Sequence, residues 1–461
     1  MRLTRIRELG AEPAVTIGGR TLSYAHLAGA AGALAQQLAG ARRVAVRAQS
    51  TLETVVAVVA GLESGIEVVP LNPQLGAAEL EHILGDSRPE LVIDDQLVDL
   101  AAHGVLPPPP TDPERVALIV YTSGTTGAPK GVLMPRRAIA SNLDAIAEAW
   151  DWTAADSLAH ALPLFHVHGL VLGVIGPLRL GGHVHHLGRF SPEASAVALA
   201  SGDTMLFGVP TMYHRLADAA EADPAVAEGL SRARLLVSGS APLPERTFAR
   251  IEAVTGQRIV ERYGLTETIM NTAVRADGER RPGEVGAPLA GVEVRLLTDD
   301  GGEAPSDGET IGEVVVRGPN LFLGYLNRPE ASAEVLRDGW FWTGDLATRS
   351  ADGYLRIVGR RSTDLIKTGG FKVGAGEIEG ALLEHPAVSE AAVRGLADGD
   401  LGERIVAWVV LRDASATSER ELIEHVAVLL APHKRPREIH FVDALPRNAM
   451  GKVVKARLRP S

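Results

Sequence analysis

The sequence predicts an α/β fold. A large N-terminal domain of parallel-sheet α/β subdomains with a small β-rich subdomain is expected to precede a mobile α+β C-terminal domain. Three observations carry this prediction. Strand-like and helix-like segments alternate over residues 1–105, later strand-like runs end in loops of small polar residues, and the alternation restarts after Arg361. A chain of 461 residues is too long for one hydrophobic core, so two or three domains are expected.

The composition narrows the class of protein. Hydrophobic residues make up 46% and charged residues 22% of the chain, as in an ordinary globular protein. A net charge of −11 does not supply the basic surface that nucleic-acid binding needs. The absence of cysteine excludes disulfides, cysteine nucleophiles and thiolate metal sites. No signal peptide and no apolar run of about twenty residues is visible, so a cytoplasmic enzyme without membrane or nucleic-acid partners is expected.

The first part of the chain reads as strand–helix units. Apolar runs predict strands at 43–47, 67–71 and 91–93, and helical periodicity predicts helices at 52–62 and 77–84. This alternation favours βαβ units and a mainly parallel sheet. Four consecutive prolines at 107–110 fit neither a helix nor a central strand, so they predict a surface linker.

A loop of serine, threonine and glycine follows the apolar run Val116–Tyr121, in the string YTSGTTGAPKG. Small residues let backbone N–H groups approach an anion closely, the hydroxyls donate further hydrogen bonds, and Lys130 adds positive charge. This chemistry suits a polyphosphate. The string is not the nucleotide loop that ends in Gly-Lys-Ser/Thr, because neither Ser nor Thr follows Lys130. Taken alone, such a loop is also typical of a solvated connection.

Two further strand-like runs end in the same way. Residues 234–237 lead into Ser238-Gly239-Ser240, and residues 258–260 lead into the string ERYGLTE. If these strands and the run before Ser123 are parallel, their carboxyl ends bring the three loops to one cleft.

A strand at 204–210 and a helix from Thr211 place Arg215 one helical turn beyond that strand. From there Arg215 could point back toward the strand's carboxyl end. An arginine at this position is also typical of a solvated helix.

The rest of the chain divides into three parts. Helical periodicity runs from Ala138 to Trp150, and short strands around turns predict a β-rich subdomain at 291–318 that closes with residues 338–347. A short strand, YLRIV, follows at 354–358. The pattern then restarts, which predicts helices near 377–384 and 419–430 and strands at 388–393, 404–410 and 438–442.

These strings, in this order, resemble those of the adenylate-forming superfamily, which includes acyl-CoA synthetases, luciferases and the adenylation domains of peptide synthetases. The resemblance extends from Tyr121 to Lys452 and therefore covers essentially the whole chain. It implies a reaction in two halves. A carboxylate attacks the α-phosphate of ATP to give an acyl adenylate and pyrophosphate, and the thiol of CoA then displaces AMP. ATP, Mg²⁺ and CoA are therefore the expected cofactors and co-substrates.

The resemblance also implies roles for individual residues. Tyr263 matches the ring that stacks on adenine, Thr266 the hydroxyl at the α-phosphate, and Glu267 the carboxylate that holds Mg²⁺. Asp345 matches the acceptor of both ribose hydroxyls, although an aspartate after glycine is also a common turn residue. The full set implied for ATP binding is Thr122, Ser123, Gly124, Thr125, Thr126, Gly127, Lys130, Ser238, Gly239, Ser240, Tyr263, Thr266, Asp345 and Arg360.

The C-terminal strings imply a mobile domain. Residues 1–360 are expected to form the AMP-binding domain and residues 361–461 the mobile domain, with the pivot near Ser362. Lys452 takes the family's catalytic position, together with Thr266 and Glu267, although a lysine in a basic tail is common in itself. Gly369 and Gly370 would let the backbone approach CoA.

The acyl pocket is expected to bind malonate or methylmalonate. The strings LPLFHVHGL, GVPTMYHR, ERYGLTETIMNT and LIKTGGFKVGAGEIE together resemble those of synthetases for these acids. His166 matches the family's residue at the edge of the acyl pocket, whereas His168 is more simply a hydrogen-bonded packing residue. Because a buried second carboxylate needs a cation, Arg262 and Arg215 are the expected partners.

Other functions stay open at this point. The chain could instead activate a short monocarboxylic or an aryl acid, or act as a stand-alone adenylation domain that loads a carrier protein. A nucleotide-binding regulatory module without turnover would be a different class of protein. The presence of Lys130, Glu267, Asp345 and Lys452 argues against it.

Overall fold

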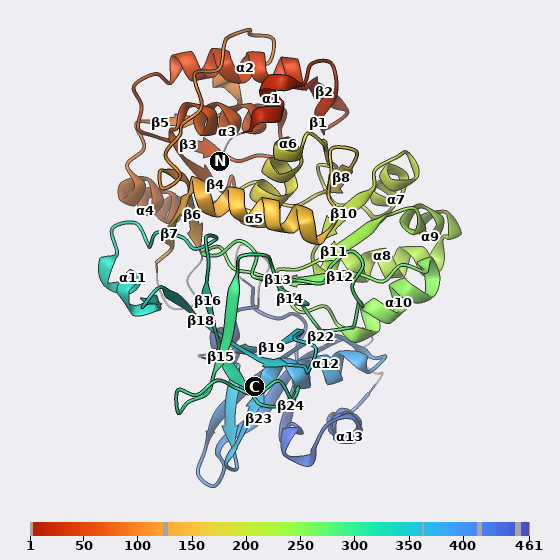
Figure 1. Ribbon diagram of the computed structural model, residues 1–461. Helices are drawn as coiled ribbons and strands as arrows, with labels where there is room; N and C mark the ends of the chain where they lie inside the picture. Colours follow the sequence, from red (N-terminus) through yellow and green to blue (C-terminus); the bar gives the residue numbers. More distant parts are fainter. Residues whose placement is uncertain (1–2, 123–127, 362–363, 413–416, 448–452, 461) are drawn as a thin grey trace.

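The computed structural model describes residues 3–122, 128–361, 364–412, 417–447 and 453–460. The strands of this part of the chain form four sheets, with helices packed on and between them (Figure 1). The mixed α/β architecture with a smaller C-terminal part confirms the predicted fold class. No helix in the described residues is long and apolar enough to cross a membrane.

The largest sheet has nine strands in the order β14-β13-β12-β11-β10-β8-β9-β1-β2. Its central strands, from β12 to β1, run parallel, and β13, β14 and β2 each pair antiparallel with their neighbour. The bounds are β1 Pro13–Ile17, β2 Arg20–Ser23, β8 Ser157–His160, β9 His183–His186, β10 Met205–Gly208, β11 Leu235–Ser238, β12 Val260–Tyr263, β13 Thr272–Ala273 and β14 Ala287–Pro288.

Different helices pack against the two faces of this sheet. Leu206 and Leu236 pack under four helices, which lie on the right of Figure 1: α7 (Pro192–Ala200), α8 (Pro210–Ala222), α9 (Pro224–Ser231) and α10 (Glu245–Thr255). Phe207 and Val237 face the main core, where Trp150 and Trp152 pack edge-on against Phe207. That core also contains α5 (Arg136–Ala149), α6 (Gly176–Leu180) and the π-helix η2 (His168–Ile175).

A second, five-stranded sheet has the order β5-β3-β4-β6-β7. Its strands are β3 Arg43–Arg47, β4 Glu67–Leu71, β5 Leu91–Ile93, β6 Val116–Thr122 and β7 Lys130–Pro135. The helices of this region are α1 Thr4–Glu8, α2 Tyr24–Gln37, α3 Leu52–Ser64, α4 Ala77–Ser87 and the short η1 Asp95–Leu97. Nearly every residue of α3 is buried, which agrees with the apolar run at its centre.

The position of β6 corrects one expectation. The sequence analysis expected parallel strands to bring its loop to one cleft with those that follow β11 and β12, but β6 belongs to the smaller sheet rather than to theirs. It also forms an antiparallel hairpin with β7, with Thr122 opposite Lys130. The pattern did not reveal this, because an apolar run before a polar loop does not specify the strand that pairs with it.

The third sheet is the expected β-rich subdomain. It contains β15 Glu293–Leu297, β16 Gly312–Arg317, β17 Leu336–Arg337, β18 Trp340–Arg349 and β19 Leu355–Arg360, with the helix α11 Pro329–Val335 beside it. Strand β18 carries Asp345, which lies opposite Arg360 of β19.

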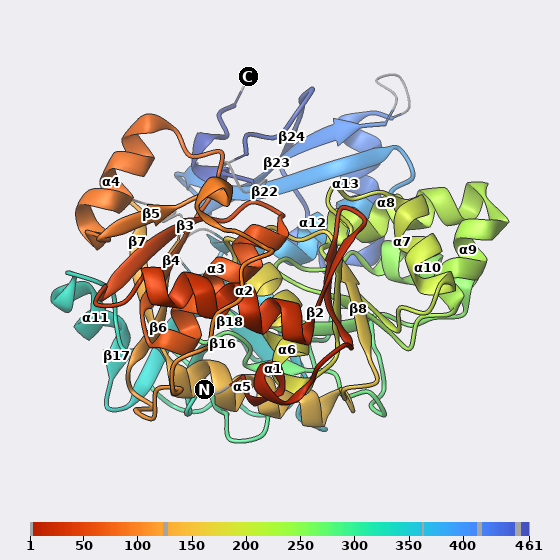
Figure 2. The same ribbon diagram turned by 90° about the horizontal axis from the view of Figure 1, so that it is seen from above.

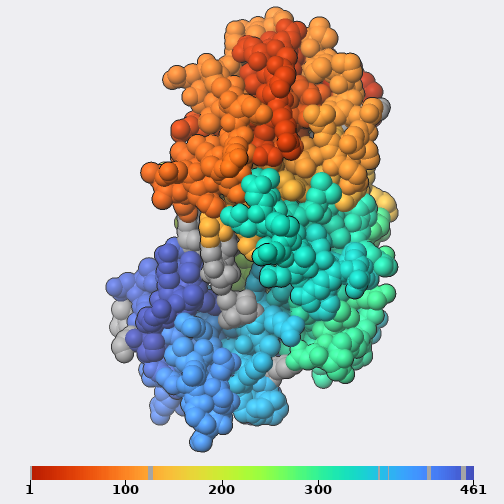
Figure 3. Space-filling view, turned by 90° about the vertical axis from the view of Figure 1, so that its left-hand side faces the viewer, coloured from red at the N-terminus to blue at the C-terminus, as the bar shows by residue number. Residues whose placement is uncertain are grey.

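The C-terminal part has its own sheet and core. The strands are β20 Leu365–Thr368, β21 Phe371–Gly374, β22 Val388–Asp398, β23 Gly402–Leu411 and β24 Glu438–Phe441, and the helices are α12 Ala375–Glu384, α13 Glu419–Leu429, η3 Pro432–Lys434 and η4 Lys455–Arg457. Ile378, Leu382 and Leu422 fill a separate hydrophobic cluster. In Figures 1 and 3 this part occupies the end of the molecule opposite residues 1–100, and Figure 2 shows β22–β24 side by side. Its helix α12 packs against α10.

Candidate active site

The first loop ends at Lys130, which a tyrosine and a histidine help to position. The Lys130 Nζ lies 4.9 Å from the ring centroid of Tyr325, within the range of a cation–π contact. His82 of α4 lies beside the preceding residue, with its Nε2 3.0 Å from the carbonyl oxygen of Pro129. Thr122, at the other end of the loop, directs its Oγ1 to the carbonyl oxygen of Lys130 at 3.5 Å. Ser123, Gly124, Thr125, Thr126 and Gly127 lie outside the described residues.

Tyr325 also connects Lys130 to Glu267. Its hydroxyl donates to Glu267 Oε1 at 2.8 Å, and the N–H of Phe322 donates to the carbonyl oxygen of Glu267 at 2.9 Å. Burial and the neighbouring Glu267 carboxylate both raise the pKa of Tyr325. A cation and a half-buried carboxylate from different strings therefore meet at one tyrosine. Thr266 is half-buried beside Glu267.

Tyr263, Asp345 and Arg360 form a second connected group. The Tyr263 hydroxyl donates to Asp345 Oδ2 at 2.6 Å, and Arg360 Nε lies 2.9 Å from Asp345 Oδ1. Burial and the Asp345 charge raise the pKa of Tyr263, which therefore stays protonated as a donor. Burial would lower the pKa of Arg360, but the negative groups around it, Asp345 first, raise it instead. This structure brings together three residues that the sequence placed in separate strings.

Arg262 lies on the opposite face of β12, because consecutive residues of a strand point to opposite sides. It is 6% exposed, and its Nε and Nη2 have no hydrogen-bond partner among the described residues. Burial lowers the pKa of this guanidinium to about 10, so it remains charged at neutral pH. A buried cation without a counterion is costly, and a bound anion would remove much of that cost.

Gly239 gives Arg262 its space. A Cβ at position 239 would lie 2.3 Å from the Cζ and Nε of Arg262, so any larger residue would collide with the guanidinium. The neighbouring Ser240 holds a left-handed φ of +73°, a conformation uncommon outside glycine. Ser238 is buried, and its Oγ has no partner among the described atoms. Gly239 and Ser240 of this loop therefore lie beside Arg262 and His168.

His168 is a buried, hydrogen-bonded packing residue, as the sequence analysis expected, but its position beside Ser240 was not foreseen. It begins the π-helix η2, is 8% exposed, and its Nδ1 lies 3.3 Å from Ser240 Oγ, while its Nε2 has no partner among the described residues. Burial first and the charge of Arg262 second lower its pKa well below the usual value, so the ring is neutral. His166 packs beside Phe165 at 4.5 Å between ring centroids, and its charge also acts on His168. The rarity of π-helices outside functional sites was the missing signal, and periodicity alone does not reveal it.

Tyr325 is the residue that the sequence analysis missed. It lies in the string LGYLNRPE, where an aromatic residue after glycine carried no functional signal.

Arg215 does not join this group. It lies on α8, is exposed, and makes no hydrogen bond or ion pair with a described residue. The structure therefore does not bring it together with Arg262.

The candidate residues for CoA binding, Gly369 and Gly370, lie between two strands of the C-terminal sheet. Gly369 and Gly370 form the turn between β20 and β21 with φ values of +56° and +84°, which favour glycine. Lys452 and Ser362 lie outside the described residues. Lys455, a little further along, forms ion pairs of 2.6 Å with both Asp364 and Glu379 and fixes the end of the chain to its domain.

Comparisons with known proteins show which enzymes this chain is similar to. The chain is 36% identical to a malonate–CoA ligase of Arabidopsis thaliana, over 91% of this chain and 79% of the relative. It is 57% identical to a malonyl-CoA ligase solved as a ternary product complex with methylmalonyl-CoA and AMP, with a TM-score of 0.74 over 95% of this chain and 97% of the other. It is 34% identical to ATP-bound MatB from Rhodopseudomonas palustris, with a TM-score of 0.90 over 99% and 98% of the two chains.

Family models give the same result. The model described as "AMP-binding enzyme" matches residues 4–326, and the model of the AMP-binding enzyme C-terminal domain matches residues 377–452. The first match alone covers more than half of the chain, and it includes Lys130, Tyr263 and Glu267. This chain belongs to the AMP-binding enzyme family.

Proposed function

We propose that this protein is an ATP-dependent acid–thiol ligase that converts malonate or methylmalonate and CoA into the thioester, with release of AMP and pyrophosphate. The observation that carries the choice of a dicarboxylate is the buried guanidinium of Arg262, which lies against Gly239 and has two nitrogens without a partner among the described residues. A monocarboxylic acid would leave that cation buried and unpaired, whereas the second carboxylate of malonate supplies its counterion. The malonate–CoA ligase relatives support the same choice.

In the first half-reaction, one substrate carboxylate oxygen attacks the α-phosphorus of ATP, and the bond to the pyrophosphate oxygen breaks. The protein supplies position and charge rather than a nucleophile. We assign Lys130, the hydroxyl loop before it and Thr266 to the phosphates. Tyr263 and the loop Ser238–Ser240 would hold the adenine, and Asp345 with Arg360 would hold the ribose.

In the second half-reaction, the CoA sulfur attacks the acyl carbonyl carbon, and AMP leaves. We assign the Gly369-Gly370 turn to CoA, His166 to the edge of the acyl pocket, and Lys452 to the carboxylate and α-phosphate during the first step. Arg215, which is exposed on α8, is the least supported of the proposed substrate contacts.

Glu267 fits a magnesium ion. Tyr325 donates to one of its oxygens, and no hydrogen bond from a described residue to the second is seen, so this oxygen of the half-buried carboxylate would be able to bind a cation. The described residues contain no group of three or more His, Cys, Asp or Glu suited to a metal. Mg²⁺ would therefore take most of its ligands from phosphate oxygens and water, as it prefers. When bound, Mg²⁺ would neutralise charge on the phosphates.

We further propose that residues 361–461 rotate as one domain between the two half-reactions. The overlay is closer for the ATP-bound relative, with a TM-score of 0.90, than for the product complex, with 0.74, although the latter is more similar in sequence. A different arrangement of two similar domains would produce this order. A cytoplasmic location remains a prediction.

The test is a panel of acids assayed for pyrophosphate and AMP release, with and without CoA. Malonate and methylmalonate should support pyrophosphate release without CoA and full turnover with it, whereas acetate, propionate and benzoate should be poor substrates. Preferential turnover of a monocarboxylic acid would overturn the dicarboxylate assignment. Transfer to a carrier protein but not to CoA would overturn the ligase assignment.

A further inference from the structure

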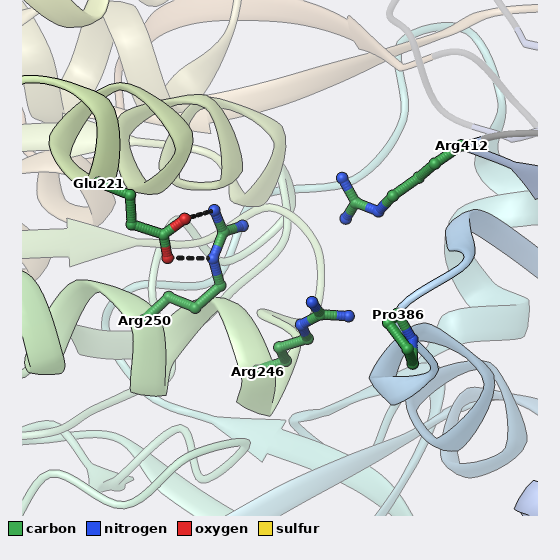
Figure 4. Close-up of a pocket in the computed structure, with 5 residues that line it drawn as sticks. All are labelled: Glu221, Arg246, Arg250, Pro386 and Arg412. Carbon is green, nitrogen blue, oxygen red and sulfur yellow. Dashed lines mark hydrogen bonds and ion pairs between the residues drawn. The ribbon is translucent and has the colours of Figure 1, made fainter.

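A cavity of about 270 Å³ lies at the seam between the N-terminal and C-terminal parts, away from the residues assigned above. Glu221 of α8 and two arginines of α10, Arg246 and Arg250, line one side, and Pro386 and Arg412 of the C-terminal part line the other. Figure 4 shows Arg246 and Arg412 reaching into the same space from opposite domains.

The three arginines are not equivalent. Arg250 is neutralised, because it makes a bidentate ion pair with Glu221 at 2.6 and 2.7 Å and bonds Asp218 at 2.7 Å. These bonds, opposed by burial, raise the pKa of Arg250. Arg250 therefore stabilises the wall of the cavity, and its ion pairs engage the carboxylates of Glu221 and Asp218.

Arg246 and Arg412 have no such partner. Neither forms an ion pair with a carboxylate among the described residues, and the buried Nη1 of Arg246 has no hydrogen-bond partner there. The recorded side-chain contact of Arg412 is its Nη2 at 3.5 Å from His214 Nε2, and a histidine does not neutralise it. Two guanidinium groups therefore face one cavity with donors to spare.

We propose that this seam binds a phosphate group, held between Arg246 of one domain and Arg412 of the other. Guanidinium forks match the oxygens of phosphate, and a dianion can accept from both sides at once. The cavity has room for such a group with several waters, each of which takes about 30 Å³. The phosphate could be free, as orthophosphate or pyrophosphate, or could belong to a nucleotide.

The site is complete only when the two domains have the arrangement described here. A ligand that binds one arrangement better than another shifts the population toward it. A phosphate at the seam would therefore favour this arrangement and delay any step that requires the C-terminal domain to move away. This consequence rests on the proposed function, whereas binding itself does not.

The binding test uses the full chain without substrates, titrated calorimetrically with orthophosphate and with pyrophosphate at constant ionic strength. We expect a dissociation constant of about 1 mM or below, weakened about tenfold or more in R246Q and in R412Q and less in the charge-retaining R246K and R412K. The control R420Q removes a guanidinium that is 84% exposed on α13 and should bind as the wild type does. Parallel titrations with CoA and 3′-dephospho-CoA distinguish a nucleotide phosphate from a free one.

Three results would overturn the site. Unchanged affinity in both R246Q and R412Q is the first, and an equal loss in R420Q, which would indicate a general charge effect, is the second. The third is loss in K130A alone, which would assign the anion to the active site. The kinetic consequence is tested separately, since phosphate should slow CoA-dependent thioester formation more than adenylate formation in the wild type and should not do so in R412Q.

Discussion

The two faces of strand β12 differ in how completely their polar groups are paired. On the side that we propose binds the nucleotide, Tyr263 bonds Asp345, which pairs with Arg360, and Tyr325 bonds Glu267 beneath Lys130. On the side that we propose binds the acyl group, Arg262 and His168 are buried, and each has at least one nitrogen without a partner among the described residues.

This difference indicates what each side contributes. Groups that already hold one another are preorganised and need little rearrangement when ATP arrives. A buried cation without a counterion instead destabilises the free protein, and a substrate anion recovers that cost on binding. Under the proposed function, the side of Tyr263 would therefore provide a fixed frame for the nucleotide, and the side of Arg262 would select the substrate.

Lys452→Ala should have the largest effect, because the proposed role of Lys452 touches both sides, at the substrate carboxylate and the α-phosphate. A positioned donor on developing charge contributes roughly 3 kcal/mol or more. Adenylate formation should fall by at least two to three orders of magnitude, measured as exchange of pyrophosphate into ATP. Thioester formation from preformed malonyl adenylate should fall much less, and an equal loss in both steps would contradict the assigned role.

Arg262→Gln should separate activity from stability. Truncating one partner of a buried charge pair costs about 2–5 kcal/mol, so kcat/KM for malonate should fall about thirtyfold or more. Propionate turnover should hold or rise, and the melting temperature should not fall, because an unpaired buried charge is removed.

The matched control for Arg262→Gln is Arg232→Gln, which alters a surface arginine 63% exposed and paired with Glu228. It should leave the ratio of malonate to propionate turnover unchanged. If Arg262→Gln also leaves that ratio unchanged, the acyl side does not select by charge.

Much of the fold followed from local patterns. The strands and helices from Arg43 to Ile93 lie where periodicity placed them, because strand and helix periods differ and the segments are short and apolar. The partner of β6 did not follow, since pairing between strands depends on packing that a single segment does not encode.

Residues of the candidate site could be predicted from the sequence only where they lay in a recognisable motif. Tyr263, Glu267 and Asp345 lie in such motifs. In the structure Tyr263 bonds Asp345, and Glu267 accepts a hydrogen bond from Tyr325. Tyr325 and His168 lie in apolar strings, and their partners are distant in sequence, so only three-dimensional packing reveals them. Arg215 is the opposite case. Its position one helical turn beyond a strand suggested a substrate contact, but its side chain is exposed in the structure, which does not support that role.

Tyr325→Phe tests whether the nucleotide side is a fixed frame. The change removes the hydroxyl that bonds Glu267 and keeps the ring under Lys130. A hydrogen bond to a charged group is worth about 1.5–3 kcal/mol, so adenylate formation should fall about tenfold or more, with a higher magnesium requirement. Tyr354→Phe, in a half-buried tyrosine away from this site, is the control. An unchanged magnesium dependence would contradict the role of Tyr325 in positioning Glu267.

Glu261→Gln tests the same strand through pH. Burial raises the pKa of Glu261 to about 8, although hydrogen bonds from the N–H groups of Gly283 and Leu243 oppose the shift. The folded state therefore holds a proton that the unfolded state releases near pH 4.5, so stability falls as pH rises from about 4.5 to 8. The slope from one proton is at most about 1.4 kcal/mol per pH unit. Urea unfolding at several pH values should show a flatter dependence in the variant, and parallel wild-type and variant curves would contradict the buried, protonated carboxyl.

Arg215→Ala should have the smallest effect and bears most directly on the contrast between the two faces. Arg215 is exposed on α8 and has no described partner, so any contact that it makes with a substrate carboxylate is screened by water. An exposed ion pair contributes about 0–1 kcal/mol, which limits the loss in kcat/KM for malonate to about fivefold. The double variant Arg215→Ala/Arg262→Gln should then show the sum of the two separate effects, because groups that do not interact act independently. A loss of thirtyfold or more for Arg215→Ala alone, or strong non-additivity in the double variant, would mean that both arginines grip one carboxylate. Selection by charge would then extend from the buried face of β12 to the surface of α8.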